Sequence, residues 1–308
     1  IHETPLTYDP GLDLYLKWEN HQVTGSFKVR GAFNKVIGLQ PWEQERGLVA
    51  SSAGNHGAGV ALAAKTIGVP ATIFVPQNAD AAKIKAIKHL GAALRRVEGS
   101  YGDAEAAGMQ YALESSSTWV SPYNDGQVIS GQATLGLEVL RQLPAETPCT
   151  WLVPVGGGGL LAGIVSAYQY AKKQARVQYA GGEHAFIGIQ SEASPFMHAI
   201  YLRGSQEGVV EYSSLADGLA GEIEGTSITI PIIKRYANDL LLVSESEIAR
   251  AIVYAWQKYQ ERLEGSAAAA LAAALFADGI PRPMLAIITG GNIDPEVHQS
   301  LCREFGVK

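Results

Sequence analysis

The sequence has little charge, little cysteine and no concentration of basic residues, and each shortage excludes a class of protein. Charged residues make up 18% of the 308 residues, below the usual share of about 25%. Asp and Glu outnumber Lys and Arg by 30 to 24, and no basic run is longer than Lys172-Lys173. Because nucleic-acid binding needs a positive face or stripe, we expect no nucleic-acid partner.

Only two cysteines are present, Cys149 and Cys302, and they lie far apart in the chain. So few cysteines exclude a disulfide framework and a zinc knuckle, and they are typical of a protein in a reducing compartment. The seven histidines form no His-x-x-x-His pair, and no Gly-x-Ser-x-Gly turn is present. We therefore expect a cytoplasmic protein.

One uncharged stretch, residues 147–171, is long enough to span a membrane. Pro154 and the glycines 156–159 interrupt it, so a strand, a glycine loop and a helix explain the stretch better than a membrane helix. No secretory signal stands at the start, and we expect no membrane partner. Because the first residue is Ile1 and not Met, we expect that a leader or a short N-terminal segment is missing from this numbering.

Short apolar runs alternate with helical patterns along the chain, which is typical of a parallel α/β architecture. The runs are rich in Val, Ile and Leu with little alternation, as expected where helices cover both faces of a sheet. The expected strands are 48–52, 71–75, 93–97, 118–120, 150–155, 186–190, 240–243 and 284–288. The expected helices are 58–66, 79–90, 103–115, 128–143, 160–173, 245–263 and 266–277.

Glycine is in excess, with 34 residues, and two glycine-rich turns lie where a strand passes into a helix. The first is Ser51-Ser52-Ala53-Gly54-Asn55-His56-Gly57 and the second is Gly156-Gly157-Gly158-Gly159. Unpaired N–H groups at a helix N-terminus bind anions, and four glycines let the backbone surround a phosphate. The Ser and Asn side chains of the first turn suit a carboxylate. Either turn alone could also be only a tight strand-to-helix connection.

Lys28 stands among apolar residues in Thr24-Gly25-Ser26-Phe27-Lys28-Val29-Arg30-Gly31, just inside a helix that Ser26 could cap. A single lysine is most often a solvated side chain. A lysine that forms a Schiff base must be deprotonated, and partial burial lowers its pKa. Such a lysine, a phosphate-binding turn and a carboxylate-binding turn are what pyridoxal phosphate with an amino-acid substrate requires.

A nicotinamide or flavin enzyme is the alternative, because the second turn also reads Gly157-x-Gly159-x-x-Ala162. That pattern needs an acidic residue about 20 residues further on, whereas Glu192 lies beyond that distance. A nicotinamide oxidoreductase also has no use for Lys28.

Five segments, in this order, resemble those of threonine/serine dehydratases, which are fold-type-II (tryptophan synthase β-like) pyridoxal-phosphate enzymes. They are SFKVRGA at 26–32, SAGNHG at 52–57, GQAT at 131–134, GGGG at 156–159 and TGGN at 289–292. The likeness runs from Thr4-Pro5-Leu6 to Asn292. It implies an α/β fold with two doubly wound, mostly parallel sheets, pyridoxal 5′-phosphate as cofactor, and a homo-oligomer, either a dimer or a tetramer.

The resemblance also implies a division into two domains and a role for each site residue. A small domain, about 41–126, would be inserted in a large domain of 1–40 and 127–308, with the cofactor in the cleft between them. Lys28 would form the Schiff base beside Phe27, and Asn55 would bond the 3′-oxygen of the cofactor. The backbone residues expected at the phosphate are Gly156, Gly157, Gly158 and Gly159. The residues expected at the substrate carboxylate are Ser51, Ser52, Ala53, Gly54 and Asn55.

Two further residues are implied near the cofactor ring, Thr289 at the pyridine nitrogen and Glu264 beside the ring. A hydroxyl at Thr289 cannot hold the nitrogen protonated as a carboxylate would, which favours loss of the β-substituent. The implied reaction converts a small β-hydroxy amino acid, L-threonine or L-serine, into a 2-oxo acid and ammonia. Lys28 would remove the Cα proton, and the cofactor phosphate would assist loss of the β-hydroxyl. Thr289 could equally be a hydroxyl that caps Gly290 and Gly291.

The sequence departs from related families at several positions. Serine racemases have a serine at the position of Ala53 as second proton donor, although Ser51 or Ser52 could replace it here. Sulfhydrylases and threonine synthases usually differ at Val29 and His56. An amino-acid racemase, a β-replacement enzyme and an inactive cofactor-binding module stay open as alternatives.

Gln190 stands where racemases and some dehydratases have a carboxylate for a divalent cation, so we expect no metal. Glu192 could serve instead, but a charge at a helix N-terminus explains it as well. The sequence ends shortly after Asn292. We therefore expect neither the C-terminal regulatory domain of the biosynthetic dehydratases nor isoleucine feedback through it.

Overall fold

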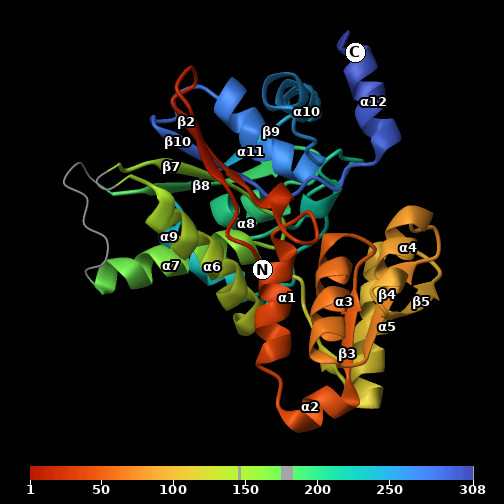
Figure 1. Ribbon diagram of the computed structural model, residues 1–308. Coiled ribbons are helices and arrows are strands. Elements are labelled where there is room, and N and C mark those ends of the chain that lie inside the picture. Colours follow the sequence, from red (N-terminus) through yellow and green to blue (C-terminus); the bar gives the residue numbers. More distant parts are fainter. Residues whose placement is uncertain (145–146, 175–182, 308) are drawn as a thin grey trace. The chain divides into compact units, whose positions relative to one another are not determined.

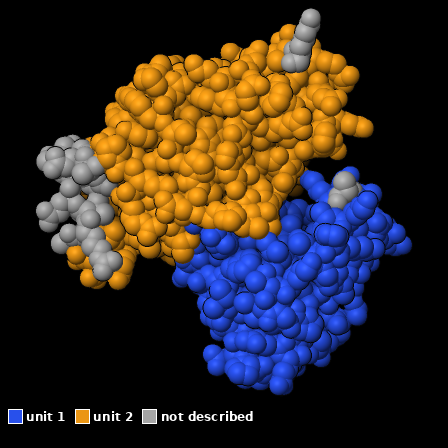
Figure 2. Space-filling view, viewed as in Figure 1, with its two compact units in different colours: residues 1, 28–132 blue, residues 2–27, 133–308 orange. Residues whose placement is uncertain are grey.

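The computed structural model describes residues 1–144, 147–174 and 183–307 (Figure 1). Contacts group the chain into two compact units, coloured separately in Figure 2. Unit 1 comprises Ile1 and Lys28–Gln132, and unit 2 comprises His2–Phe27 and Ala133–Lys308. Each unit is built on a mostly parallel sheet with helices, which confirms the expected α/β fold class.

Unit 1 contains a four-stranded parallel sheet in the order β5-β4-β3-β6. Its strands are β3 (Leu48–Ser51), β4 (Ala71–Pro76), β5 (Ala93–Val97) and β6 (Thr118–Trp119). Its helices are α1 (Lys28–Ile37), α2 (Pro41–Arg46), α3 (Asn55–Ile67), α4 (Ala81–His89), α5 (Tyr101–Ser115) and the first part of α6 (Gly126–Gln142). Alternate residues of β3 face opposite cores, since Leu48 and Ala50 pack with α1 and α3 whereas Val49 packs with α5.

Unit 2 contains a six-stranded sheet in the order β1-β2-β10-β7-β8-β9. Its strands are β1 (Leu6–Asp9), β2 (Leu14–Trp18), β7 (Thr150–Pro154), β8 (Ala185–Ser191), β9 (Asp239–Val243) and β10 (Met284–Ile288), and only β1 pairs antiparallel among them. Its helices are α7 (Gly159–Lys173), α8 (Phe196–Arg203), α9 (Thr229–Tyr236), α10 (Glu245–Tyr259), α11 (Gly265–Phe276) and α12 (Pro295–Glu304), with short 3-10 turns η1 (Glu19–His21) and η2 (Asp217–Leu219).

The alanine-rich tract folds as α11, a helix whose residues from Gly265 to Ala274 are all buried. Side chains of one methyl group let this helix lie close to the central strands β7 and β10, which it contacts. The uncharged stretch 147–171 contains β7 and most of α7, as expected. In the described part of the chain, no helix combines the length and the apolar character that crossing a membrane requires.

Several elements differ from the expectations. The helix expected at 245–263 ends at Tyr259, because Gln260 adopts a left-handed conformation with φ of 59°. The helix expected from residue 58 already begins at Asn55. Ser26 does not cap α1, since its buried hydroxyl has no hydrogen-bond partner. The strands β1 and β2 and the helices α2, α8, α9 and α12 were not predicted.

The expected small domain, residues 41–126, lies inside unit 1, which is larger at both ends. Unit 1 begins at Lys28 because α1 packs against α3, and it ends at Gln132 within α6. The division into a small domain of residues 41–126 and a large domain of residues 1–40 and 127–308 stays a prediction.

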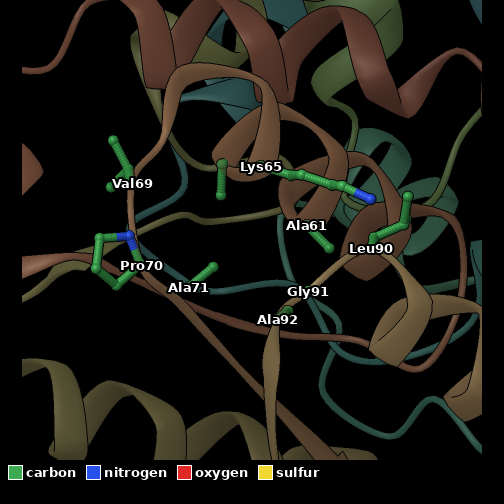
Figure 3. A pocket seen from close by; sticks show the side chains of 9 residues that line it. Ala61, Lys65, Val69, Pro70, Ala71, Leu90, Gly91 and Ala92 are labelled. Atoms are coloured by element: carbon green, nitrogen blue, oxygen red, sulfur yellow. The ribbon is translucent and has the colours of Figure 1, made fainter.

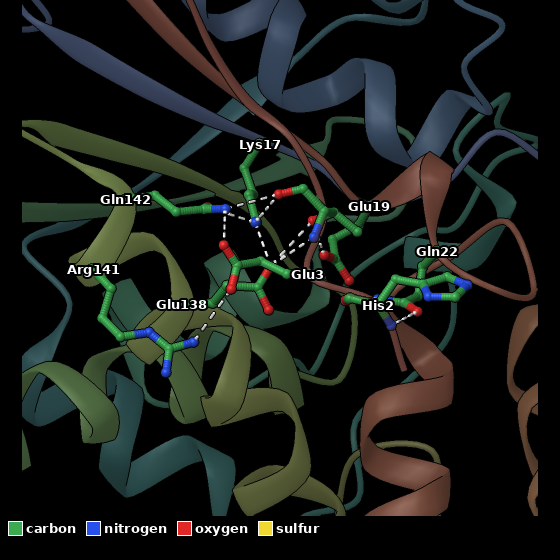
Figure 4. A network of polar contacts seen from close by, with 9 residues as sticks. His2, Glu3, Lys17, Glu19, Gln22, Glu138, Arg141 and Gln142 are labelled. Carbon is green, nitrogen blue, oxygen red and sulfur yellow. Dashed lines mark hydrogen bonds and ion pairs between the residues drawn. The ribbon is translucent and has the colours of Figure 1, made fainter.

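A buried network of polar side chains connects the N-terminal segment of unit 2 to α6 (Figure 4). The Lys17 ammonium, fully buried on β2, donates to Glu138 Oε1 at 2.5 Å, to Gln142 Oε1 at 2.8 Å and to the Thr4 carbonyl oxygen at 2.7 Å. The Thr4 hydroxyl in turn donates to Glu19 Oε1 at 2.5 Å. The network holds residue 19, and hence the chain that leads to Lys28, on helix α6.

We expect Lys17→Met to reduce the free energy of unfolding by about 3–5 kcal/mol, because it removes a charged partner of the buried Glu138. The double variant Lys17→Met/Glu138→Leu should recover part of that loss. Urea unfolding followed by circular dichroism measures both. The control is Arg141→Ala, which breaks an exposed pair with Glu3 at 3.8 Å and should cost no more than about 1 kcal/mol. Equal losses for Lys17→Met and Arg141→Ala would show that the buried pair contributes little.

Candidate active site

The segment before Lys28 is held against the chain that follows β10, within unit 2. The Phe27 N–H donates to the Thr289 carbonyl oxygen at 3.1 Å, and the Gly291 N–H donates to the Gly25 carbonyl oxygen at 3.0 Å. The Asn292 side-chain amide adds a bond to the Thr24 carbonyl oxygen at 2.8 Å. Parallel strands present their carboxyl ends as a ligand-binding edge, and β10 ends here. The backbone of Phe27, and therefore the peptide that leads into Lys28, is fixed at this edge.

Thr289 and Glu264 lie at the same edge of the sheet. The Thr289 side chain is buried, and its hydroxyl has no hydrogen-bond partner. The Glu264 N–H donates to the Gly290 carbonyl oxygen at 3.2 Å, and its carboxylate lies so close to Gly290 that a Cβ there would collide with it. A buried hydroxyl without a partner is costly, so Thr289 is suited to a polar atom of a ligand.

The glycine loop Gly156–Gly159 connects β7 to α7, as predicted. Gly158 is the N-cap of α7 in a left-handed conformation, with φ of 85°, which a residue with a side chain rarely adopts. Among the residues that the structure describes, the N–H groups of Gly157, Gly158 and Gly159 donate no hydrogen bond. Unpaired N–H groups at a helix N-terminus fit a phosphate.

Unit 1 carries Lys28 at the first position of α1. The Lys28 ammonium donates to the Pro122 carbonyl oxygen at 3.2 Å. Three residues further along α1, the Gly31 N–H donates to the side-chain oxygen of Gln132 at 3.2 Å, so the motif GQAT supports the first turn of the lysine helix. Unit 1 also holds His56, which is buried and donates from Nε2 to the Val120 carbonyl oxygen at 2.9 Å.

The first glycine turn connects β3 to α3, also as predicted. The Ser51 hydroxyl donates to the Phe74 carbonyl oxygen at 3.3 Å, so its proton is committed to the neighbouring strand. The Ser52 hydroxyl accepts from the Gly54 N–H at 3.1 Å, and Gly54 is the N-cap of α3. From α5, the Tyr101 hydroxyl donates to the Ser51 carbonyl oxygen at 3.0 Å. The turn is therefore held on both sides of the strand end, and Asn55 opens the helix.

The structure thus gathers the predicted residues into two sets. Unit 2 brings together Phe27, the glycine loop, Glu264 and Thr289, and unit 1 contains Lys28 and the turn Ser51–Asn55. The Phe27–Lys28 peptide bond joins the two sets covalently. Further residues were missed because they lie outside recognisable motifs. These are the buried, unpaired hydroxyl of Ser266 and the hydroxyls of Ser227 and Thr229.

Two cavities in the described part of the chain are lined by none of the predicted site residues. A cavity of about 100 Å³ in unit 1 is lined by apolar side chains of α3 and β4 together with Lys65 (Figure 3). A wider depression of about 390 Å³ lies between α10 and α11 of unit 2, with Arg250 over the ring of Phe276. Neither resembles a site for the chemistry that the motifs imply.

Gln190 is fully buried on β8, where its side-chain oxygen accepts from the His198 N–H at 3.0 Å. Glu192 is exposed and follows the strand. In the described ranges, no group of three or more His, Cys, Asp or Glu side chains is placed to hold a metal ion.

The family model described as pyridoxal-phosphate dependent enzyme matches residues 1–290 of this chain. The chain belongs to this family. The cofactor of the family is pyridoxal phosphate, as predicted, and the residues fit it: the glycine loop offers unpaired N–H groups to a phosphate and Thr289 offers an unpaired hydroxyl to the ring.

Individual members of the pyridoxal-phosphate family are similar over nearly the whole chain. An L-threonine ammonia-lyase of Thermotoga maritima is 39% identical over 96% of this chain and 72% of its own length. The processed threonine deaminase isoform 2 of Solanum lycopersicum has a TM-score of 0.88 at 28% identity, over 99% of this chain and 89% of that one. A serine racemase of Dictyostelium discoideum has a TM-score of 0.83 at 31% identity, over 95% and 94%. The fold-type-II architecture is thereby confirmed.

We expect His56 to make the protein less stable in mild acid. Burial, with the charge of Lys28 as a second cause, lowers the pKa of His56 from 6.5 to about 3. Between these values the unfolded chain binds a proton that the folded chain does not, so stability falls as the pH falls, by up to about 1.4 kcal/mol per unit. In urea unfolding between about pH 7 and about pH 5, His56→Asn should reduce this slope.

The control for this measurement is His89→Asn, which changes an exposed histidine of the same unit. An equal slope in wild type and His56→Asn would show that His56 does not bind its proton on unfolding in this range.

Proposed function

We propose that this chain is a pyridoxal-phosphate-dependent ammonia-lyase that converts L-threonine or L-serine into a 2-oxo acid and ammonia. The observation that carries the proposal is the bond from Phe27 to Thr289. It fixes the residue before Lys28 beside the unpaired hydroxyl that suits the cofactor ring. The relatives named threonine ammonia-lyase and threonine deaminase, similar over nearly the whole chain, support the same reaction.

Each set of site residues has its own task in this proposal. Lys28 would hold the cofactor covalently, and its amine would remove the proton from Cα of the substrate. Phe27 and Glu264 lie along the ring, Thr289 bonds the pyridine nitrogen, and Asn55 bonds the ring hydroxyl oxygen. The phosphate is bound by Gly156, Gly157, Gly158 and Gly159. The substrate carboxylate is bound by Ser51, Ser52, Ala53, Gly54 and Asn55. Pyridoxal phosphate supplies the electron-withdrawing ring that makes the Cα proton acidic.

The local structure explains how the chain's own groups serve these tasks. N–H groups at the start of α3, beyond Gly54, suit a carboxylate for the same reason that the start of α7 suits a phosphate. A hydroxyl at Thr289 donates or accepts one hydrogen bond but carries no charge, so it does not favour a protonated ring nitrogen. With such a partner, the cofactor would favour loss of the β-hydroxyl group over return of a proton to Cα.

We expect Lys28→Ala to reduce kcat for threonine by at least about 10²–10⁴-fold, because it removes the base and the covalent anchor together. The purified wild-type protein with pyridoxal phosphate should show a visible absorbance band, and borohydride should fix the cofactor on Lys28, as mass spectrometry of the peptides would show. A coupled assay for 2-oxo acids measures the product.

Lys65→Ala, which changes an exposed lysine on α3, is the control and should leave both readouts unchanged. Product formation by Lys28→Ala at the wild-type rate would refute the role of the lysine. Absence of 2-oxo acid from every β-hydroxy amino acid in a panel would refute the reaction.

A racemase is the second candidate, favoured by the similarity to the Dictyostelium discoideum protein. Racemisation requires a second proton donor, which Ala53 cannot be, and the Ser51 proton is engaged by Phe74. We therefore expect wild type to form at least about tenfold more 2-oxo acid than D-serine from L-serine, and Ala53→Ser to raise the share of D-serine. Chiral chromatography of the products measures the ratio. D-serine as the main wild-type product would make the racemase the better assignment.

We further propose that the enzyme works in the cytoplasm as a homo-oligomer. Both cysteines are free and buried, which is typical of a reducing compartment. The family resemblance supports a dimer or a tetramer, which light scattering of the purified protein would distinguish.

A further inference from the structure

A chain of hydroxyl groups outside the predicted motifs supports the glycine loop of unit 2. The Thr229 Oγ1 lies 2.7 Å from the Gly157 carbonyl oxygen and 2.8 Å from the Ser227 Oγ. The Thr229 N–H lies 3.3 Å from the Ser227 Oγ. Thr229 is the first residue of α9, and its side chain and that of Ser227 are buried.

The direction of each bond follows from the chemistry of the groups. A carbonyl oxygen only accepts, so the single hydroxyl proton of Thr229 points to Gly157. The bond between the two hydroxyls must then use the proton of Ser227. The Ser227 oxygen in turn accepts from the Thr229 N–H. The result is a chain of hydrogen bonds in which Ser227 donates to Thr229 and Thr229 donates to the Gly157 carbonyl oxygen.

Fixing this carbonyl group also fixes an N–H group of the loop. In a trans peptide the C=O of Gly157 and the N–H of Gly158 point in opposite directions. While Thr229 holds the carbonyl oxygen on its own side, the Gly158 N–H points away from α9. That N–H is one of the donors in the loop that no described residue uses.

Helix α9 and its neighbour α8 also restrict the loop by packing. A Cβ on Gly158 would come within 3.2 Å of Thr229, Ile233 and Met197, so the loop backbone lies directly on these side chains. Glycine loops have no side chains with which to hold themselves in place, and here both the hydrogen bond and the packing come from outside the loop.

We propose that Thr229 and Ser227 are positioning residues that hold the Gly157–Gly158 peptide in the orientation that binds the cofactor phosphate. This inference rests on the proposed function only in taking the glycine loop as the phosphate site. It adds two residues, at and just before the start of α9, to those that determine cofactor affinity, and no motif marked either of them.

The test compares cofactor-free protein variants titrated with pyridoxal 5′-phosphate and with pyridoxal, which lacks the phosphate. Thr229→Val keeps the shape but leaves the half-buried Gly157 carbonyl group without this hydrogen bond. We expect it to raise the Kd for pyridoxal 5′-phosphate by at least about fivefold and to leave the Kd for pyridoxal unchanged. The absorbance band of the bound cofactor gives both constants, and the ³¹P NMR shift of the bound phosphate should differ from wild type.

Thr229→Ser is the matched control, because it keeps the hydroxyl, and it should bind within about twofold of wild type. Ser227→Ala breaks the chain of hydrogen bonds one step further from the loop and should give a smaller loss of the same kind, which keeps the test decisive if Thr229→Val does not fold. Wild-type affinity in both Thr229→Val and Ser227→Ala, or equal losses for the two ligands, would overturn the inference. A phosphate-specific loss without ammonia-lyase activity in wild type would refute the proposed function and leave the inference intact.

Discussion

The short antiparallel contact between residues 24–27 and residues 289–292 is the constraint on which the candidate site depends. It joins the approach to Lys28 to the end of β10 by backbone hydrogen bonds, from Phe27 to Thr289 and from Gly291 to Gly25. Such pairing needs two backbones at close range, and Gly290 also has the Glu264 carboxylate against its Cα. The glycines that follow Thr289 are therefore required by packing whether or not they touch a ligand.

The backbone of each glycine-rich turn is held in place, but by different groups in the two turns. At the first, the side chains of Ser51 and Ser52 and the hydroxyl of Tyr101 hold the backbone in place. At the second, the loop has only backbone. The hydrogen bond from Thr229 and the side chains of Ile233 and Met197, which pack against Gly158, therefore provide the support. A loop that must expose N–H groups to an anion cannot satisfy them internally, and its rigidity has to come from its neighbours.

The sequence predicts the buried strands and the linear motifs well, because both are recognised from residues that are consecutive in the chain. Strands such as β7 and β10 are buried on both faces and appear as continuous apolar runs. β1 and β2 mix polar residues with apolar ones, so no continuous apolar run marks them. Ser26 matched a helix cap by position, yet its hydroxyl is unpaired. Ser227 and Thr229 act across more than sixty residues of chain, and no spacing rule could connect them with Gly157.

The surroundings of Lys28 in unit 1 also bear on which group acts as the base. Burial, with the charge of Lys28 as a second cause, lowers the pKa of His56 to about 3, and the His56 Nε2–H group donates to the Val120 carbonyl oxygen. A neutral imidazole adds no positive charge that would compete with the lysine for a proton or an anion. Since two neighbouring cations each disfavour the other, a neutral His56 avoids a charge repulsion with the Lys28 ammonium. The histidine of the SAGNHG motif is therefore uncharged beside Lys28 at neutral pH, and in the proposed reaction Lys28 is the base.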